Sequence, residues 1–338
     1  MKTKIFLATL LLGSSILVIQ AKMPESKYKI ANKIHLEGDG KWDYLYSDDA
    51  TGLLYVSHAT MVQVVNETTG KLVGTISGMN GVHGIAIVSE LNKGYISSGK
   101  DTMITVFDTK TFAIITRFTA SGLGPDAIFY DTFSKKVFTC NGKSKNISVI
   151  NPVTDKIIAT IALDGKPESG VSNGKGEIYV NFEAESKICE INSSTFTVEN
   201  IWPLSPGEEP TGLALDNDTH RLFSACNNKL LVIVNAETGK IVSTVSIGEN
   251  VDGAAFDPEL KCIYTSNGEG TMTVIEADNK DSFEVVENVP TQKGAKTITV
   301  NRKTHHVYLP SSDLETQQNG DKPKIVPGTF VVLDIVAK

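Results

Sequence analysis

The feature that most constrains the fold is a repeat of about 42 residues that runs along almost the whole chain. Similar apolar segments, among them GKLVGTI and GKIVSTV, carry the matching residues Lys29, Lys71, Lys156 and Lys240. These lysines are separated by 42, 85 and 84 residues, which is one period followed by two double periods. A fixed period of this length indicates an architecture built from repeated structural units.

Each unit contains four short segments typical of β-strands. The first segments of the units are WDYLYSD, VHGIAIV, PDAIFYD, PESGVSN, PTGLALD, VDGAAFD and AKTITVN, and their second residues are 40 to 44 residues apart. A turn and further β-type runs follow each of them, and no segment after residue 21 has a helical period over ten residues. Four antiparallel strands at this period predict an all-β, seven-bladed β-propeller. We expect one such domain over residues 22–338.

The two ends of the chain complete each other in this scheme. The seventh unit has only three strand segments before the chain ends, whereas residues 28–36, YKIANKIHL, form a strand segment with no partner nearby in sequence. This segment aligns with DKIIATIAL at residues 155–163, which is the fourth strand of its unit. We therefore expect residues 28–36 to be the outer strand of the last blade, so that no unpaired edge is left there.

The segments LYVSH, IYVNF and IYTSN, each leading into runs such as VFDTKT or VNAETGKIVSTV, resemble the YVTN-type β-propeller repeat. Over residues 28–338 the chain looks like the YncE-like exported propellers. This resemblance implies seven blades around a central channel. The family includes binding proteins, and related seven-bladed propellers include lactonases and lyases, so the fold does not choose a function.

The N-terminus and the composition restrict the compartment and the partners. MKTK followed by IFLATLLLGSSILVIQA predicts a signal peptide over residues 1–21, cut after Ala21, and hence a periplasmic or secreted protein. No later apolar run is long enough to span a bilayer. The net charge of −7 argues against nucleic acid as a partner. We expect a monomer whose partner is a small molecule, a glycan or a protein.

Charged side chains recur where the inner strands begin, at one mouth of the channel. Asp43, His83, Asp126, Glu168, Asp252 and Lys296 occupy the second position of six inner segments, and the second strand of the first unit ends at His58. Two interpretations are open. The acids bind a ligand at this acidic mouth, or they accept hydrogen bonds from the adjoining turns and only fix the blades.

Two functions are likewise open, a binding protein and an enzyme. With no recognisable catalytic motif, the sequence favours a binding or interaction protein without a resident cofactor. The alternative is a lyase or lactone hydrolase that uses a histidine and carboxylates, with or without a divalent metal ion. Imidazole and carboxylate ligands suit such an ion, and His83, Asp126 and Asp43 are the residues expected to hold it.

Three further features stand outside the repeat. A long polar segment at residues 312–328 is expected to form a loop over the mouth, where long loops often carry function. His305 and His306 are expected in a solvated turn at the opposite face. Four cysteines without a C-x-x-C pair are expected to be small buried side chains instead of disulfides or metal ligands.

Overall fold

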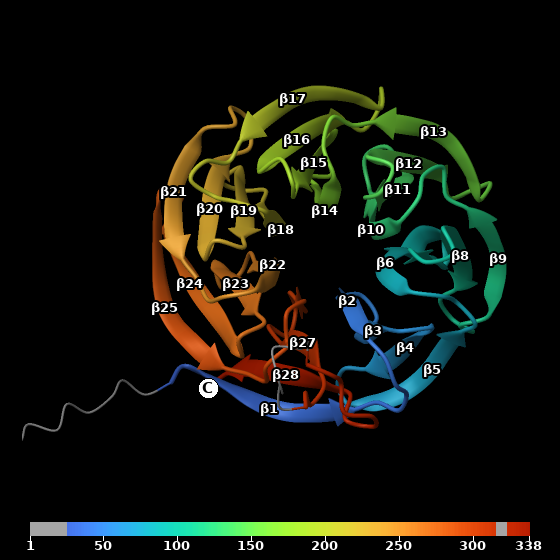
Figure 1. Ribbon diagram of the computed structural model, residues 1–338, viewed down its shortest axis with the longest axis horizontal. Helices are drawn as coiled ribbons and strands as arrows, with labels where there is room; N and C mark the ends of the chain where they lie inside the picture. The colour runs from blue at the N-terminus through green and yellow to red at the C-terminus, as the bar shows by residue number, and fades with distance from the viewer. Residues whose placement is uncertain (1–25, 316–322) are drawn as a thin grey trace, which may run out of the picture.

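The computed structural model describes residues 26–315 and 323–338, and in them the chain forms seven four-stranded antiparallel sheets arranged in a ring (Figure 1). The predicted signal peptide and part of the 312–328 loop lie outside these residues. Within the part of the chain that is described, no helix has the length and hydrophobicity of a membrane span.

Blades 1 to 7 are numbered by their innermost strands, which surround the central channel: β2 (Trp42–Asp48), β6 (Val82–Val88), β10 (Pro125–Asp131), β14 (Pro167–Ser172), β18 (Pro210–Asp216), β22 (Val251–Asp257) and β26 (Thr299–Val300). The second strands are β3 (Leu53–His58), β7 (Lys93–Ser98), β11 (Lys136–Asn141), β15 (Glu177–Phe182), β19 (Arg221–Cys226), β23 (Cys262–Asn267) and β27 (Val307–Ser311).

The third strands are β4 (Met61–Asn66), β8 (Met103–Asp108), β12 (Asn146–Asn151), β16 (Lys187–Asn192), β20 (Leu230–Asn235), β24 (Thr271–Asn279) and β28 (Val331–Ala337). The outer strands are β5 (Lys71–Ser77), β9 (Ile114–Thr119), β13 (Lys156–Ala162), β17 (Thr197–Pro203), β21 (Ile241–Ser246), β25 (Ser282–Pro290) and β1 (Tyr28–His35). A 3₁₀ turn, η1 (Ser89–Leu91), joins β6 to β7.

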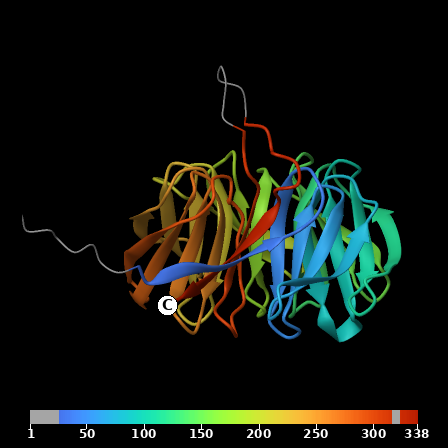
Figure 2. The same cartoon turned by 90° about the horizontal axis from the view of Figure 1, so that it is seen from below.

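The ring closes as the sequence predicts, because β1 pairs with β28 in an antiparallel ladder from Tyr28–Ala337 to His35–Val331. Figure 2 shows β1 lying across the rim beside the C-terminal strand. One difference from the expectation concerns the inner strand of blade 7, which comprises only Thr299 and Val300 although the apolar segment begins at Ala295.

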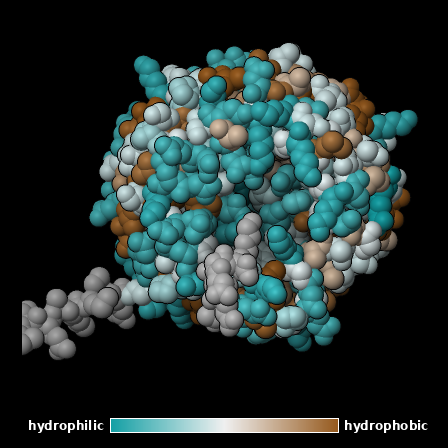
Figure 3. All heavy atoms as spheres, in the orientation of Figure 1, coloured by the Kyte–Doolittle hydropathy of each residue, from teal (hydrophilic) through white to brown (hydrophobic). Residues whose placement is uncertain are grey.

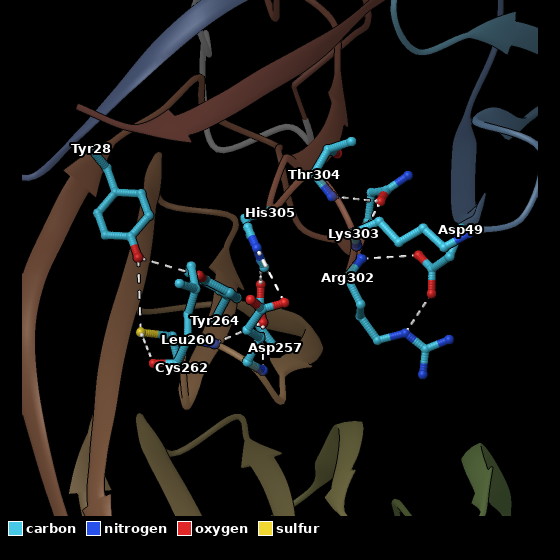
Figure 4. A network of polar contacts seen from close by, with 12 residues as sticks. Tyr28, Asp49, Asp257, Leu260, Cys262, Tyr264, Arg302, Lys303, Thr304 and His305 are labelled. Carbon is cyan, nitrogen blue, oxygen red and sulfur yellow. Dashed lines mark hydrogen bonds and ion pairs between the residues drawn. The ribbon is translucent and has the colours of Figure 1, made fainter.

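Polar contacts hold blade 7 to its two neighbours (Figure 4). The Tyr28 and Tyr264 hydroxyl groups lie 3.2 Å apart, and the Arg302 guanidinium donates to Asp49 of blade 1 at 2.7 Å. His305 lies 2.7 Å from the buried Asp257 carboxylate of blade 6. The expectation of a merely solvated turn is therefore wrong for His305, whose ring links two blades.

His306 was also expected to be solvated, but its ring contacts a carboxylate. Its Nδ1 lies 2.7 Å from Oδ1 of Asp334 on β28. Asp334 is 6 % exposed, so this contact is partly removed from solvent. His306 thus braces strand β28 within blade 7, whereas His305 joins blade 7 to blade 6.

The hydrophobic core consists of layers between adjacent blades. Among the described residues, each pair of neighbouring blades shares one cluster of buried apolar side chains. A four-stranded sheet has two faces to bury, and radial packing buries both against neighbouring sheets. The four cysteines are free and buried within or beside these layers, as expected.

Candidate functional site

The candidate site lies at the end of the channel where the inner strands begin. In blades 1 to 6 the pairing register of the inner strand shifts close to its first residue, for example between Trp42 and Leu45 of β2. Such β-bulges redirect side chains. The amide of Asp43 accordingly donates to the Ser57 hydroxyl, at 3.1 Å, instead of to the ladder. The bulges therefore free the second residue of each strand to line the mouth.

Side chains from blades 1, 2 and 3 form the tightest cluster there. Nδ1 of His83 is hydrogen-bonded to the Asp43 carboxylate and lies 3.5 Å from Oδ1 of Asp126. One ligand atom of each residue lies within 4.8 Å of the others. On its other edge the imidazole faces Gly99, where a Cβ atom would lie 2.7 Å from Nε2. The hydrogen bond to Asp43 thus orients the ring, and the absence of a side chain at Gly99 leaves the space that the ring occupies.

Electrostatics set the protonation states of this cluster. Burial opposes the charged form of His83, but the hydrogen bond to Asp43 and the charges of Asp126 and Asp43 outweigh it and raise the pKa of His83 to about 9. Burial, followed by the repulsion from Asp43, holds the pKa of Asp126 well above its usual range. At neutral pH His83 is therefore an imidazolium, and Asp126 is the carboxyl group with the greater tendency to hold a proton.

Asp126 also differs from the other mouth acids in its partners. Within the residues that the structure describes, the Asp126 carboxyl group makes no hydrogen bond, and its contact with His83 is shared with Asp43. Its side chain is 26 % exposed. This carboxyl group is therefore the one that an incoming group could contact without displacing a protein donor.

Blade 4 contributes an acid that has its own cation. Nζ of Lys166 lies 3.0 Å from Oε2 of Glu168 and also contacts Glu183. Burial and the nearby Glu183 raise the pKa of Glu168 to about 7, although Lys166 opposes the shift. Glu168 therefore changes its charge near neutral pH.

Blades 6 and 7 supply the remaining charged pair. Nζ of Lys296 lies 2.7 Å from Oδ2 of Asp252. Burial raises the pKa of Asp252 even though Lys296 opposes the change. Thr211, the residue at this position in blade 5, is buried, and its hydroxyl donates to the Val251 carbonyl at 3.0 Å. Blade 5 thus adds no charge to the mouth.

The structure does not bring His58 to this cluster. Its ring is fully buried and stacks on Phe330 with centroids 3.9 Å apart, while Nδ1 lies 3.2 Å from Oε1 of Gln63. Burial lowers its pKa, because the charged form loses water that Gln63 only partly replaces. Gly38 lies against the same ring from the segment between β1 and β2. His58 is therefore a core residue at the closure seam.

The described flanks of the 312–328 loop lie at this same end of the ring. Leu314 and Ile325 form an isolated antiparallel bridge, and the amide of Gly328 donates to Asp39 at 2.9 Å. These flanks stand up from one face of the disc in Figure 2. Near them Trp42 packs against Phe330, with ring centroids 5.7 Å apart.

Behind the charged side chains the channel contains a cavity of about 170 Å³. Its wall includes Tyr44, Ile85, Ile128, Ser169 and Asp252. In Figure 3 the centre of this face is hollowed and bordered by hydrophilic side chains. The site is therefore a polar rim above a partly apolar part of the channel, and hollows of this kind suit small ligands.

A divalent metal fits the cluster chemically. One imidazole nitrogen and two carboxylate oxygens from Asp43, His83 and Asp126 form a mixed set that such ions accept, and the open mouth leaves room for further ligands. Binding through Nδ1 would require His83 to lose the proton that its neighbours stabilise. Metal affinity at this cluster would accordingly rise with pH.

Three mouth residues escaped the reasoning from sequence. The sequence comparison used the second residue of each inner strand and the last residue of each second strand. Lys166 and Glu183 lie close to these positions, so the comparison did not include them. Tyr44 follows Asp43 directly, and it is a large aromatic residue where the other inner segments have a small one. A comparison of the third residues of the inner segments would have found it.

No protein-family model matches the chain. The chain is 24 % identical to the uncharacterized protein YncE of Salmonella typhi over 193 residues, which cover 55 % of this chain and 54 % of that protein. The YncE protein of Salmonella typhimurium strain LT2 matches to the same extent. The chain thus spans about half the length of the curated relatives it matches.

Solved structures share the fold at low sequence identity. The Kuenenia stuttgartiensis hydrazine synthase superposes with a TM-score of 0.71 and 14 % identity, covering 81 % of this chain and 94 % of that one. The WD40 repeats of RRP9 give a TM-score of 0.76 at 9 % identity, covering 90 % and 98 %. U3-55K gives 0.75 at 9 % identity, with the same coverage. At these identities the similarity establishes the propeller fold alone.

Proposed function

Taking this chain as a YncE-like seven-bladed β-propeller, we propose that it is a binding protein whose acidic channel mouth holds a small ligand that carries a positive charge. The observation that supports this most directly is the Asp126 carboxyl group, which makes no hydrogen bond within the described residues while Glu168 and Asp252 each have a lysine. A cation at Asp126 would relieve the repulsion from Asp43. A divalent metal ion and an organic ammonium group share this chemistry.

The first experiment measures binding to protein purified without chelator. Metal content is determined, and Ca²⁺, Mn²⁺, Zn²⁺ and putrescine are titrated calorimetrically. We expect at least one of them to bind, and Asp126→Asn to weaken it about 10- to 100-fold, the range for loss of one charge-assisted hydrogen bond.

Asp101→Asn is the matched control. It makes the same change of charge at an exposed residue in the turn after β7, at the same end of the ring. If both variants lost the same affinity, the effect of Asp126 would be one of overall surface charge and not of a specific site. If none of the probes bound, the proposal would be refuted.

A second candidate is the lyase or lactone hydrolase. Its support is the hydrogen-bonded pair of Asp43 and His83 beside Asp126 and Glu168, whose pKa values are raised. A carboxyl group whose pKa is raised toward neutral pH can act as a general acid. A panel of lactones assayed with wild type and His83→Gln tests it. Turnover that disappears in the variant while the melting temperature is unchanged would favour the enzyme, and no turnover by wild type would exclude lactone hydrolysis.

A further inference from the structure

One ring of residues lies directly below the charged mouth. It consists of the third residue of each inner segment, and in six blades this residue is small: Gly84, Ala127, Ser169, Gly212, Gly253 and Thr297. Blade 1 has Tyr44 at this position. All seven line the channel cavity. Only one blade therefore sends a long side chain into the channel at this level.

The ring of Tyr44 reaches well away from its own blade. Although β2 belongs to blade 1, the Tyr44 side chain packs against the core cluster between blades 3 and 4, which includes Ala127 and Cys140. Blade 2 lies between them in the ring, and it has Gly84 at the equivalent place. In Figure 1, β2 and β14 face each other across the channel. A side chain that joins these blades must cross the channel.

We infer that Tyr44 closes the channel beneath the carboxylates and makes the mouth a one-ended cup with a phenol hydroxyl at its floor. Small residues elsewhere in the ring leave the space that the phenol occupies. Below this level Ile85, Ile128, Leu213 and Ile298 line the shaft with apolar side chains. The hydroxyl therefore lies where the polar rim gives way to the apolar wall.

The position of the hydroxyl defines its role. A tyrosine hydroxyl keeps its proton at neutral pH, so this group can donate a hydrogen bond. The role of the hydroxyl in binding rests on the proposed function. If a ligand is held by Asp126, closure at Tyr44 means that the ligand enters and leaves through the mouth alone. A ligand with an acceptor oxygen next to its positive group would use the hydroxyl as its deepest contact.

Crystallography tests the closure without any ligand. In wild-type crystals at high resolution we expect ordered waters in the cup and in the shaft, with none bridging the level of Tyr44. Tyr44→Phe should retain the interruption, and Tyr44→Gly should show a continuous file of waters. A continuous file in the wild type would overturn the inference, and this result needs no stable variant.

Fluorine NMR tests the position of the hydroxyl in solution. Protein labelled with 3-fluorotyrosine gives a Tyr44 signal that is identified by its loss in Tyr44→Phe. We expect that signal to shift in Asp126→Asn, although Asp126 lies two blades away, while the Tyr46 signal stays in place. Tyr46 packs on Tyr55, and the charged residues nearest to its hydroxyl are Asp48, Arg302 and Asp49. A Tyr44 signal indifferent to Asp126→Asn would overturn the inference.

The two proposals fail separately. If no cation binds but water stops at Tyr44 and the fluorine signal shifts, the cup stands and the proposed ligand is wrong. If cations bind while waters pass Tyr44, the binding function stands and the cup is wrong.

Discussion

The partner that each mouth residue finds depends on the residue at the same position in the next blade. Asp43 is followed in the ring by His83, and Asp252 is followed by Lys296, and each pair is in contact. Glu168 is followed by Thr211, so its cation comes from Lys166 in its own blade. Asp126 is followed by Glu168 and shares the imidazole of the preceding blade. Its lack of a hydrogen-bonding partner is thus a consequence of ring order.

His58 gives a prediction on pH at the same scale. Its folded-state pKa is below the ordinary value of 6.5, because burial disfavours the imidazolium. The unfolded chain therefore takes up a proton more readily, and the contribution of His58 is fully present above about pH 6.5 and is lost as the pH falls. We expect the free energy of unfolding, measured with urea from pH 8 to pH 5, to fall less steeply in His58→Gln than in wild type.

His35→Gln is the control, since His35 is exposed on β1. It should follow the wild-type curve. Parallel curves for wild type and His58→Gln would show that the buried ring does not limit stability in acid.

At the scale of elements, the strand segments follow from the short apolar runs between turn signals, and the outer strand of blade 7 follows from the repeat. The bulges in β2, β6 and β10 do not, because a register shift arises from how two strands meet. The burial of His58 was missed for a similar reason: Phe330, which stacks on its ring, is distant from it in sequence and comes from another blade. Repeat reasoning thus places charged groups around an axis but not the side chains that cover them.

The closing strand β1 can be tested by one substitution on each of its faces. Ile34 is 4 % exposed and packs with Leu36, Leu45 and Val332 in the cluster between blades 7 and 1. Ile34→Ala should lower the free energy of unfolding by about 2–5 kcal/mol, through lost burial and the cavity left behind. The measurement is a urea titration followed by circular dichroism.

The exposed neighbour provides the comparison. Lys33→Ala should change the free energy of unfolding by no more than about 0.5 kcal/mol. If both variants matched wild type, β1 would be a removable strand and the ring would be closed by other contacts.

For the whole molecule, cohesion comes from packing between blades and not from covalent links. Cys140, Cys189, Cys226 and Cys262 are all free and buried. Thermal melts with and without reductant should therefore have the same midpoint. A lower midpoint in reductant would reveal a disulfide between molecules or in another conformation.

Because β1 and β28 are paired, the two ends of the described chain lie side by side: the amide of Lys338 donates to the Lys27 carbonyl at 2.8 Å. A short linker could join them, and the chain could then be opened in another blade. The turn before β13 is a natural place, because DKIIATIAL would become the first strand and pair across a new seam in blade 3. The molecule is thus a candidate for circular permutation, in which the same circle is read from a different starting point.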